Sequence, residues 1–79
     1  MTEPNDVPKT VSLTRREQDV LEMAALGLTN REVGERLHVS VHAVKFHLAS
    51  VYRKLKVANR TEAVVAYLRM QSNPNQAEI

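Results

Sequence analysis

The side chains of this chain most able to do chemistry are cations gathered in one segment. Between Arg36 and Thr61 there are six Lys or Arg residues and no Asp or Glu, although the net charge of all 79 residues is only +2. These cations are Arg36, Lys45, Arg53, Lys54, Lys56 and Arg60. Because every acidic residue lies outside this window, the field around it should attract a polyanion.

Catalytic and metal chemistry find little support in the sequence. His42 and His47 would lie about 140° apart around a helix, so they cannot share a metal ion, and no cysteine is present to help them. Two glycines in the whole chain argue against a glycine-rich phosphate loop or a nucleophile elbow. We therefore expect no enzyme activity, no metal and no cofactor.

Composition limits the chain to one small domain. Without cysteine there is no disulfide framework, and no apolar run approaches the roughly 20 residues that span a bilayer. Residues 1–13 lack the apolar stretch of a signal peptide, so we expect a cytoplasmic protein. Residues 1–12, which contain Pro4 and Pro8, read as a flexible arm, residues 13–71 as the domain, and residues 72–79 as a flexible tail.

The segment 41–55 is the most informative of the expected helices. Ser40 is a natural N-cap, and an apolar stripe at helical spacing follows it, made of Val44, Leu48, Val51 and Leu55. The opposite arc carries His42, Phe46, Ala49 and Arg53, with Lys45 and Ser50 on its flanks. The stripe should face the core and the arc should face solvent or a partner.

A shorter helix over 30–37 precedes it, separated by a three-residue break. Thr29 and Glu32 form the pattern of a capping box, and Val33 and Leu37 make a one-turn apolar pair. Gly34 would weaken a helix interior, which is tolerable where another helix must cross closely. A short helix, a tight turn and a longer helix with a basic outer side are typical of a helix-turn-helix that reads DNA.

Two further helices complete an all-α, four-helix bundle. Thr14 and Glu17 open a helix over 15–26, which Gly27 should end in a Schellman-like turn. Asn59 and Glu62 suggest a third capping box, which would open a helix over 60–70. No segment favours a strand.

These residues together resemble the LuxR/GerE-type DNA-binding domain. The resemblance is carried by Leu13, Thr14, Arg16, Glu17, Val20, Leu21, Gly27, Leu28, Thr29, Asn30, Glu32, Val33, Leu37, Val39, Ser40, Val44, Lys45, His47, Lys54, Leu55, Val57, Asn59, Arg60, Thr61, Glu62 and Ala63. It implies a four-helix fold, with the third helix in the DNA major groove and the fourth in a dimer interface. Such domains form the output part of response regulators and quorum-sensing regulators, and also occur as free-standing regulators.

Two positions depart from the family pattern. His38 stands in the turn where the family often has glycine, which would strain a left-handed backbone there. Ala43 replaces the usual threonine, which removes one hydroxyl that could bond a phosphate.

The expected DNA contacts combine the exposed arc with nearby cations. Lys45 matches the groove-facing lysine of the family, whereas Phe46 could either contact a thymine methyl or be an incidental surface aromatic. Lys54, Lys56 and Arg60 are expected on phosphates. The full expected set is Thr29, Asn30, His42, Lys45, Phe46, Ala49, Ser50, Arg53, Lys54, Lys56 and Arg60.

The fourth helix has more apolar surface than a small core can cover. Its apolar residues span an arc of more than about 200°, whereas packing on one side of a small core needs about half of that. The outer side, formed by Thr61, Val65 and Leu68, resembles the family's self-associating surface. A symmetric homodimer would place two reading helices about 34 Å apart and favour an inverted-repeat operator.

Three functions fit the sequence. The first is sequence-specific binding of double-stranded DNA by a transcription regulator. The second is a domain like region four of a sigma factor, which does not need the dimer element expected at 60–70. The third is a four-helix module that binds another protein, such as a second regulator or RNA polymerase. The salt dependence of DNA binding separates them, because phosphate neutralisation makes log affinity fall linearly with log salt.

Overall fold

The computed structural model describes the backbone of residues 12–77 and the side chains of residues 12–71. This part of the chain forms α2 (Arg15–Ala25), α3 (Asn30–Leu37), α4 (Val41–Leu55) and α5 (Arg60–Ala77), and contains no strand. The all-α fold expected from the sequence is confirmed. The arm expected at 1–12 lies outside the described residues except for its last position.

Two capping boxes fix the starts of α2 and α3. The Thr14 hydroxyl accepts from the Glu17 amide at 3.1 Å, and the Glu17 carboxylate accepts from the Thr14 amide at 2.9 Å. Thr29 and Glu32 repeat this pattern at 3.1 and 2.8 Å. Each pair satisfies two amides that a helix start leaves unpaired, so both predicted starts are confirmed.

The start of α5 follows a different pattern from the expected box. The Asn59 side chain accepts from the Glu62 amide at 2.9 Å, as a capping asparagine should. However, the Glu62 carboxylate accepts from the amide of Ala58, at 2.8 Å, rather than from that of Asn59. The cap was predicted correctly and the reciprocal bond was not, because the carboxylate reaches one residue further back.

The helix ends also separate into expected and unexpected features. At the end of α2, Gly27 has φ +92° and the Leu28 amide donates to the Met23 carbonyl at 3.1 Å, which confirms the Schellman-like turn. By contrast, α5 continues to Ala77 and not to residue 70 as predicted. Pro74 removes one amide donor but its φ is fixed near the helical value, so one further turn can follow it.

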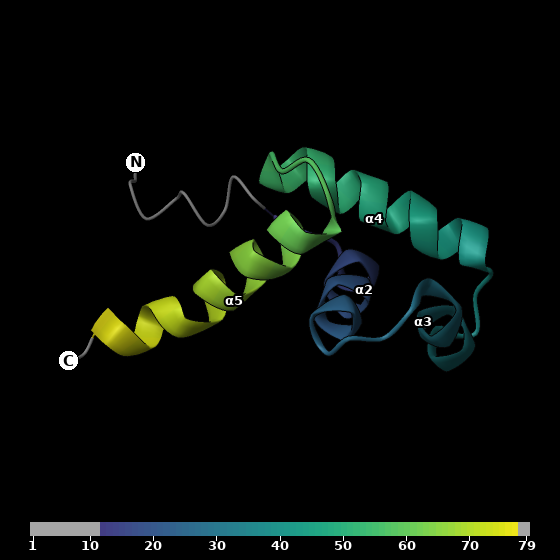
Figure 1. Cartoon of the computed structure of the whole chain (residues 1–79), viewed down its shortest axis with the longest axis horizontal. Helices are drawn as coiled ribbons and strands as arrows, with labels where there is room; N and C mark the ends of the chain where they lie inside the picture. Colours follow the sequence, from purple (N-terminus) through teal and green to yellow (C-terminus); the bar gives the residue numbers. More distant parts are fainter. Residues whose placement is uncertain (1–11, 78–79) are drawn as a thin grey trace.

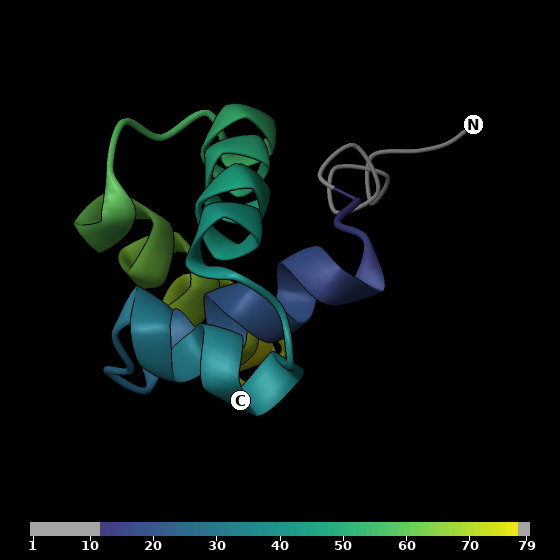
Figure 2. The ribbon, with the colours of Figure 1, turned by 90° about the vertical axis from the view of Figure 1, so that its right-hand side faces the viewer.

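Helix α2 lies at the centre of the fold and contacts the other three helices (Figures 1 and 2). Its neighbouring residues Val20 and Leu21 enter two different clusters. One cluster contains Val20, Val33, Val44 and Leu48, and the other contains Leu21, Val51 and Ala63. Tyr52 packs against both clusters, so α4 contributes side chains to each of them and contacts α2 through both.

The turn between α3 and α4 depends on the small size of Gly34. A Cβ atom at this position would lie 2.7 Å from the Val39 carbonyl oxygen and 3.6 Å from a methyl of Val44. The first distance is too short for any side chain, and the neighbour is backbone that cannot rotate away. A close approach at Gly34 is present, but the nearest neighbour is the backbone of the turn and not the crossing helix that the sequence led us to expect; α4 contributes only the Val44 methyl.

Two residues without a glycine's freedom adopt the left-handed conformation. His38, at the end of α3, has φ 60° and ψ 43°, and Lys56, at the end of α4, has φ 59° and ψ 46°. Both positions end a helix in the way that glycine usually does. His38 thus has the left-handed backbone at which strain was expected. Lys56 is a second left-handed residue, which the sequence did not suggest.

Candidate DNA interface

The outward face of α4 carries the residues expected to meet a partner. Val44 and Val51 are completely buried and Leu48 is 4% exposed, so the apolar stripe faces the core as predicted. Five residues of the expected contact set are exposed on the helix: His42, Lys45, Phe46, Ala49 and Arg53. The helix therefore presents polar and cationic groups on its free side.

Phe46 is the one large apolar side chain among these five residues, and it is 72% exposed. Its ring meets the ring of His47 edge-on, with centroids 5.9 Å apart and planes inclined by 69°. Edge-to-face contacts of this kind favour one arrangement of the two rings. Phe46 thus projects from the helix with support from a neighbour, which suits contact with an apolar group of a partner.

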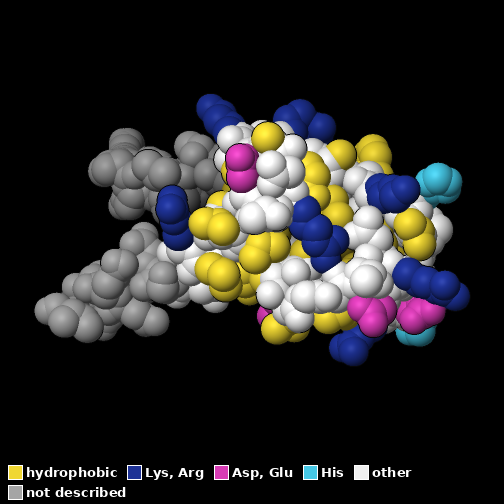
Figure 3. All heavy atoms as spheres, viewed as in Figure 1, with side chains coloured by type: hydrophobic (Ala, Val, Ile, Leu, Met, Phe, Trp, Pro, Cys, Tyr) yellow, Lys and Arg dark blue, Asp and Glu magenta, His cyan; other side chains and the backbone are white. Residues whose placement is uncertain are grey.

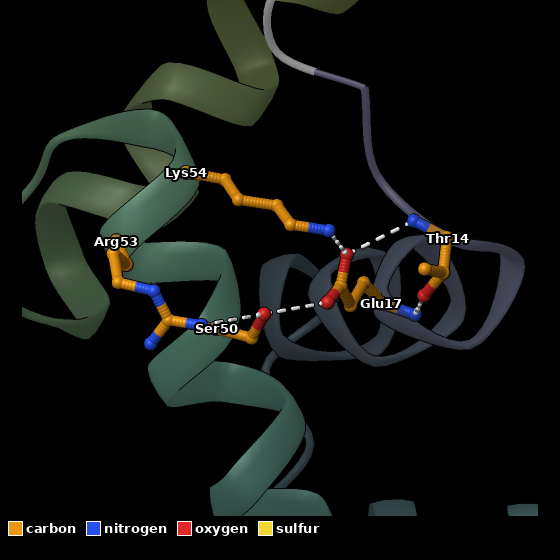
Figure 4. A network of polar contacts seen from close by, with 5 residues as sticks. All are labelled: Thr14, Glu17, Ser50, Arg53 and Lys54. Atoms are coloured by element: carbon orange, nitrogen blue, oxygen red, sulfur yellow. Dashed lines mark hydrogen bonds and ion pairs between the residues drawn. The ribbon is translucent and has the colours of Figure 1, made fainter.

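Ser50 does not belong to the exposed face, contrary to the prediction. It is 8% exposed, and its hydroxyl donates to Glu17 Oε2 at 2.6 Å (Figure 4). Helix α4 crosses α2 at this point, so its buried side is wider than the stripe of apolar residues alone. A hydroxyl can join that buried side because a carboxylate accepts its hydrogen bond.

Lys54 is also directed into the domain and not outward toward a phosphate. Its ammonium lies 2.8 Å from Glu17 Oε1, which also accepts the Thr14 amide (Figure 4). The Glu17 side chain is 7% exposed and that of Lys54 is 34% exposed. A buried carboxylate needs a compensating cation, and Lys54 supplies it.

The surroundings of Glu17 decide its charge. Burial by itself raises the pKa of this carboxyl, but hydrogen bonds from Lys54, Ser50 and the Thr14 amide more than offset it. The pKa is lowered from 4.5 to about 2. Glu17 is therefore ionised at neutral pH. The bonds from Glu17 to α4 were not predicted from the sequence, because the capping box already explained why a glutamate stands at this position.

Arg60 is the third residue expected to contact DNA that is instead bonded within the domain. Its guanidinium donates to Asn30 Oδ1 at 2.8 Å and to the carbonyl oxygen of Leu28. These bonds join the start of α5 to the turn between α2 and α3. Arg60 therefore connects two turns of the domain, and the Asn30 side chain has a partner within the fold.

Lys45, Arg53 and Lys56 are the exposed cations that remain on α4 and its final turn. No ion pair among the described residues involves any of these three. In the space-filling view, Lys and Arg side chains line the upper edge along α4 (Figure 3). This edge therefore keeps positive charge available for an anionic partner.

A second surface of different character lies on α5. Hydrophobic side chains gather over the middle of this helix (Figure 3), where Val65 is 42% and Leu68 is 52% exposed. A shallow hollow of about 330 Å³ adjoins them, lined by Val57, Thr61, Glu62, Val65, Ala66 and Arg69. The expected outer side of this helix, including Thr61, is thus exposed.

The described residues contain no cluster of three or more side chains able to hold a metal ion. None of the helices in this part of the chain combines the length and hydropathy that a membrane-crossing helix needs.

The fold and the face of α4 together define a helix-turn-helix domain: a short helix, a turn closed over a glycine, and a longer helix with a cationic outer side. Residues 11–67 match the sequence profile of the family described as "Bacterial regulatory proteins, luxR family". The chain belongs to this family. The resemblance seen in the sequence is thereby confirmed, and this is a family of regulatory proteins and not of enzymes.

Curated relatives agree with this assignment. The chain is 44% identical over 54 residues to the transcriptional regulatory protein LiaR of Bacillus subtilis (strain 168), covering 68% of this chain and 26% of LiaR. It is 42% identical over 57 residues to the transcriptional regulatory protein DegU of Brevibacillus brevis, covering 72% and 24% of the two chains. Identity to the HTH-type transcriptional activator RamA of Corynebacterium glutamicum is 42% over 74 residues, covering 94% and 26%. The chain thus spans about a quarter of the length of these relatives.

Proposed function

We propose that this domain binds double-stranded DNA sequence-specifically as part of a bacterial transcription regulator, with α4 in the major groove. The observation that carries the proposal is the outer face of α4. It combines the cations Lys45 and Arg53 with an exposed Phe46, and no carboxylate among the described residues pairs with either cation. Cationic side chains can bind the edge of guanine or a phosphate, and an apolar side chain can contact the methyl group of thymine.

We propose DNA contacts for part of the set expected from the sequence. Lys45, Phe46, Ala49 and Arg53 are proposed to face the groove, with His42 near the start of α4. Lys56 is proposed on a phosphate, and Thr29 and Asn30 present the start of α3 to the DNA backbone. Ser50, Lys54 and Arg60 are left out, because the side-chain groups that would contact DNA are bonded within the domain. Thr29 and Asn30 are kept for the helix start that they form and not for their side chains, which are also bonded within the domain.

We further propose that two copies bind one operator through the outer side of α5. Thr61, Val65 and Leu68 are exposed there, and a two-fold pair would use the same patch twice. Such a pair places two α4 helices about 34 Å apart, so the operator should be an inverted repeat. The patch is small, which favours a weak dimer that DNA strengthens.

Selection of bound sites from a random oligonucleotide pool, followed by salt titration on the selected site, tests the proposal. Lys45→Ala should weaken specific binding by about 1 to 3 kcal/mol and leave the melting temperature unchanged. Arg15→Ala is the matched control, because it removes the same charge from an exposed residue of α2. Unchanged affinity in both Lys45→Ala and Arg53→Ala would exclude the docking of α4. A pool without enrichment would favour a protein-interaction module.

A further inference from the structure

Glu17 is a buried carboxylate that receives three bonds from two directions. Its Oε1 accepts from the Thr14 amide of its own helix and from Lys54 of α4, at 2.9 and 2.8 Å. Its Oε2 accepts from the hydroxyl of Ser50, also on α4, at 2.6 Å. A capping box needs only the first bond. The other two reach across to the helix proposed to read DNA.

The two adjacent cations of α4 are treated differently by this arrangement. The ammonium of Lys54 pairs with the Glu17 carboxylate, so the charge of Lys54 is balanced inside the domain. Arg53 is exposed, and its guanidinium donates only a long bond of 3.4 Å to the Ser50 hydroxyl (Figure 4). Ser50 in turn donates to Glu17, so the same carboxylate holds the serine against which Arg53 rests.

We propose that Glu17 is a positioning residue for the DNA-facing side of α4, which withholds Lys54 from phosphates and directs Arg53 through Ser50. This inference rests on the proposed DNA binding. Charge that contacts phosphate raises affinity for all sequences alike. By holding one cation inside, Glu17 lowers sequence-independent binding while it leaves Arg53 available.

The variant Glu17→Gln tests the proposal with little change of shape. An amide oxygen can still accept from the Thr14 amide, since glutamine also serves in capping boxes. It does not balance the Lys54 charge, so that ammonium becomes available to DNA. The salt slope should steepen by about 1, equivalent to a further fall of about 3.5-fold in affinity between 50 and 200 mM salt. Freed Lys54 raises the affinity for all sequences alike, so it does not change discrimination. Discrimination between the selected site and random DNA should fall several-fold through Arg53, because the amide nitrogen that replaces Oε2 cannot accept from the Ser50 hydroxyl on which Arg53 rests.

The control for charge is Asp19→Asn. This change also removes one negative charge from α2, but Asp19 pairs with Arg15 and Arg16 of its own helix and not with α4. It should leave the slope as in the wild type. An equal steepening in both variants would show a general charge effect and overturn the proposal.

Two lysine variants decide the matter without Glu17→Gln, should that protein not fold. Lys54→Gln should leave the salt slope unchanged, whereas Lys56→Gln should reduce it by about 1. Where Glu17→Gln does fold, adding Lys54→Gln to it should return the slope to the wild-type value. A loss of about 1 in Lys54→Gln alone would mean that Lys54 contacts phosphate, and the inference would be wrong. Failure of the wild type to bind DNA would instead contradict the proposed function.

Discussion

Helices α4 and α5 cover the same small core in different ways. On α4 most of the apolar stripe is buried, with Val44 and Val51 completely so, and the opposite side carries cations around the exposed Phe46. Among the described side chains of α5 only Ala63 is buried, while Val65, Leu68 and Met70 are 42 to 52% exposed. The apolar stripe of α4 is packed within the domain, whereas α5 leaves three large apolar side chains exposed.

This difference indicates different kinds of partner for the two helices. A helix whose outer side is cationic gains from binding an anionic surface, and no ion pair among the described residues engages Lys45, Arg53 or Lys56. A helix with uncovered valine and leucine gains from burying them against another apolar surface. The two proposals, DNA at α4 and a second copy at α5, follow from this contrast.

The largest effect should come from the inner side of α4. Leu48→Ala removes a side chain that is 4% exposed, and the resulting cavity should lower the free energy of unfolding by about 2 to 4 kcal/mol. Phe46→Ala is the matched control on the same helix, because its ring is 72% exposed. Thermal melts of both proteins check this. Similar melting temperatures for Leu48→Ala and wild type would refute the orientation of α4.

Acid should weaken the anchor between α2 and α4. The Glu17 pKa is about 2 in the folded protein against 4.5 otherwise, so its stabilising contribution is complete above about pH 4.5. It is lost as the pH falls from there toward 2, and it amounts to at most about 3 kcal/mol. Urea unfolding of wild type and Glu17→Gln at pH 7 and pH 2.5 measures it. The gap between them should shrink at low pH, and a constant gap would contradict this assignment.

A charge on the outer side of α5 should separate pairing from folding. Val65→Asp puts a carboxylate into a surface that is already 42% exposed, so the melting temperature should hardly change. The two half-sites should then fill independently. The coupling free energy between them, typically about 1 to 3 kcal/mol, should disappear. Gel-shift titration of an inverted-repeat site measures the coupling, with Gln18→Glu as the control of equal charge change. Cooperativity that survives in Val65→Asp would remove α5 as the interface.

The smallest effects should come from the turns on either side of α4. His38 and Lys56 have φ near 60°, where a side chain is unfavourable, so glycine at either position should stabilise the fold by about 0.5 to 1 kcal/mol. Ala49→Gly, in a helical and exposed position, should instead destabilise by about 1 kcal/mol. Thermal melts compare the three. A loss of stability in His38→Gly would show that the imidazole makes a contribution larger than the strain.

Local features of the fold were predictable because the residues that decide them are neighbours in the sequence. The capping pairs at Thr14 and Thr29 act over three residues, and the stop at Gly27 acts over five. The end of α5 was missed because a proline predicts a break that one final helical turn does not require. The facing of α4 followed from the spacing of its apolar residues.

The roles of Ser50, Lys54 and Arg60 could not be predicted in the same way. Their partners lie 33, 37 and 30 residues away in the sequence, so each bond depends on how the helices cross. A cationic window looks uniform in the sequence, although some of its members are bonded inside the domain. The signal that could have found one of them is Glu17, because a carboxylate beside the apolar residues Val20 and Leu21 must find a cation when that helix is buried.

The bonds of Arg60 bear on how rigidly the two surfaces are related. This residue begins α5 and also holds the Leu28 carbonyl and Asn30 at the start of α3. The helix proposed for pairing and the helix that supports the reading helix are thus joined directly as well as through the core. In a pair built on α5, the distance between the two reading helices would then be nearly fixed. The domain would not bend to accommodate a changed spacing, so one base pair inserted between the half-sites would disrupt binding.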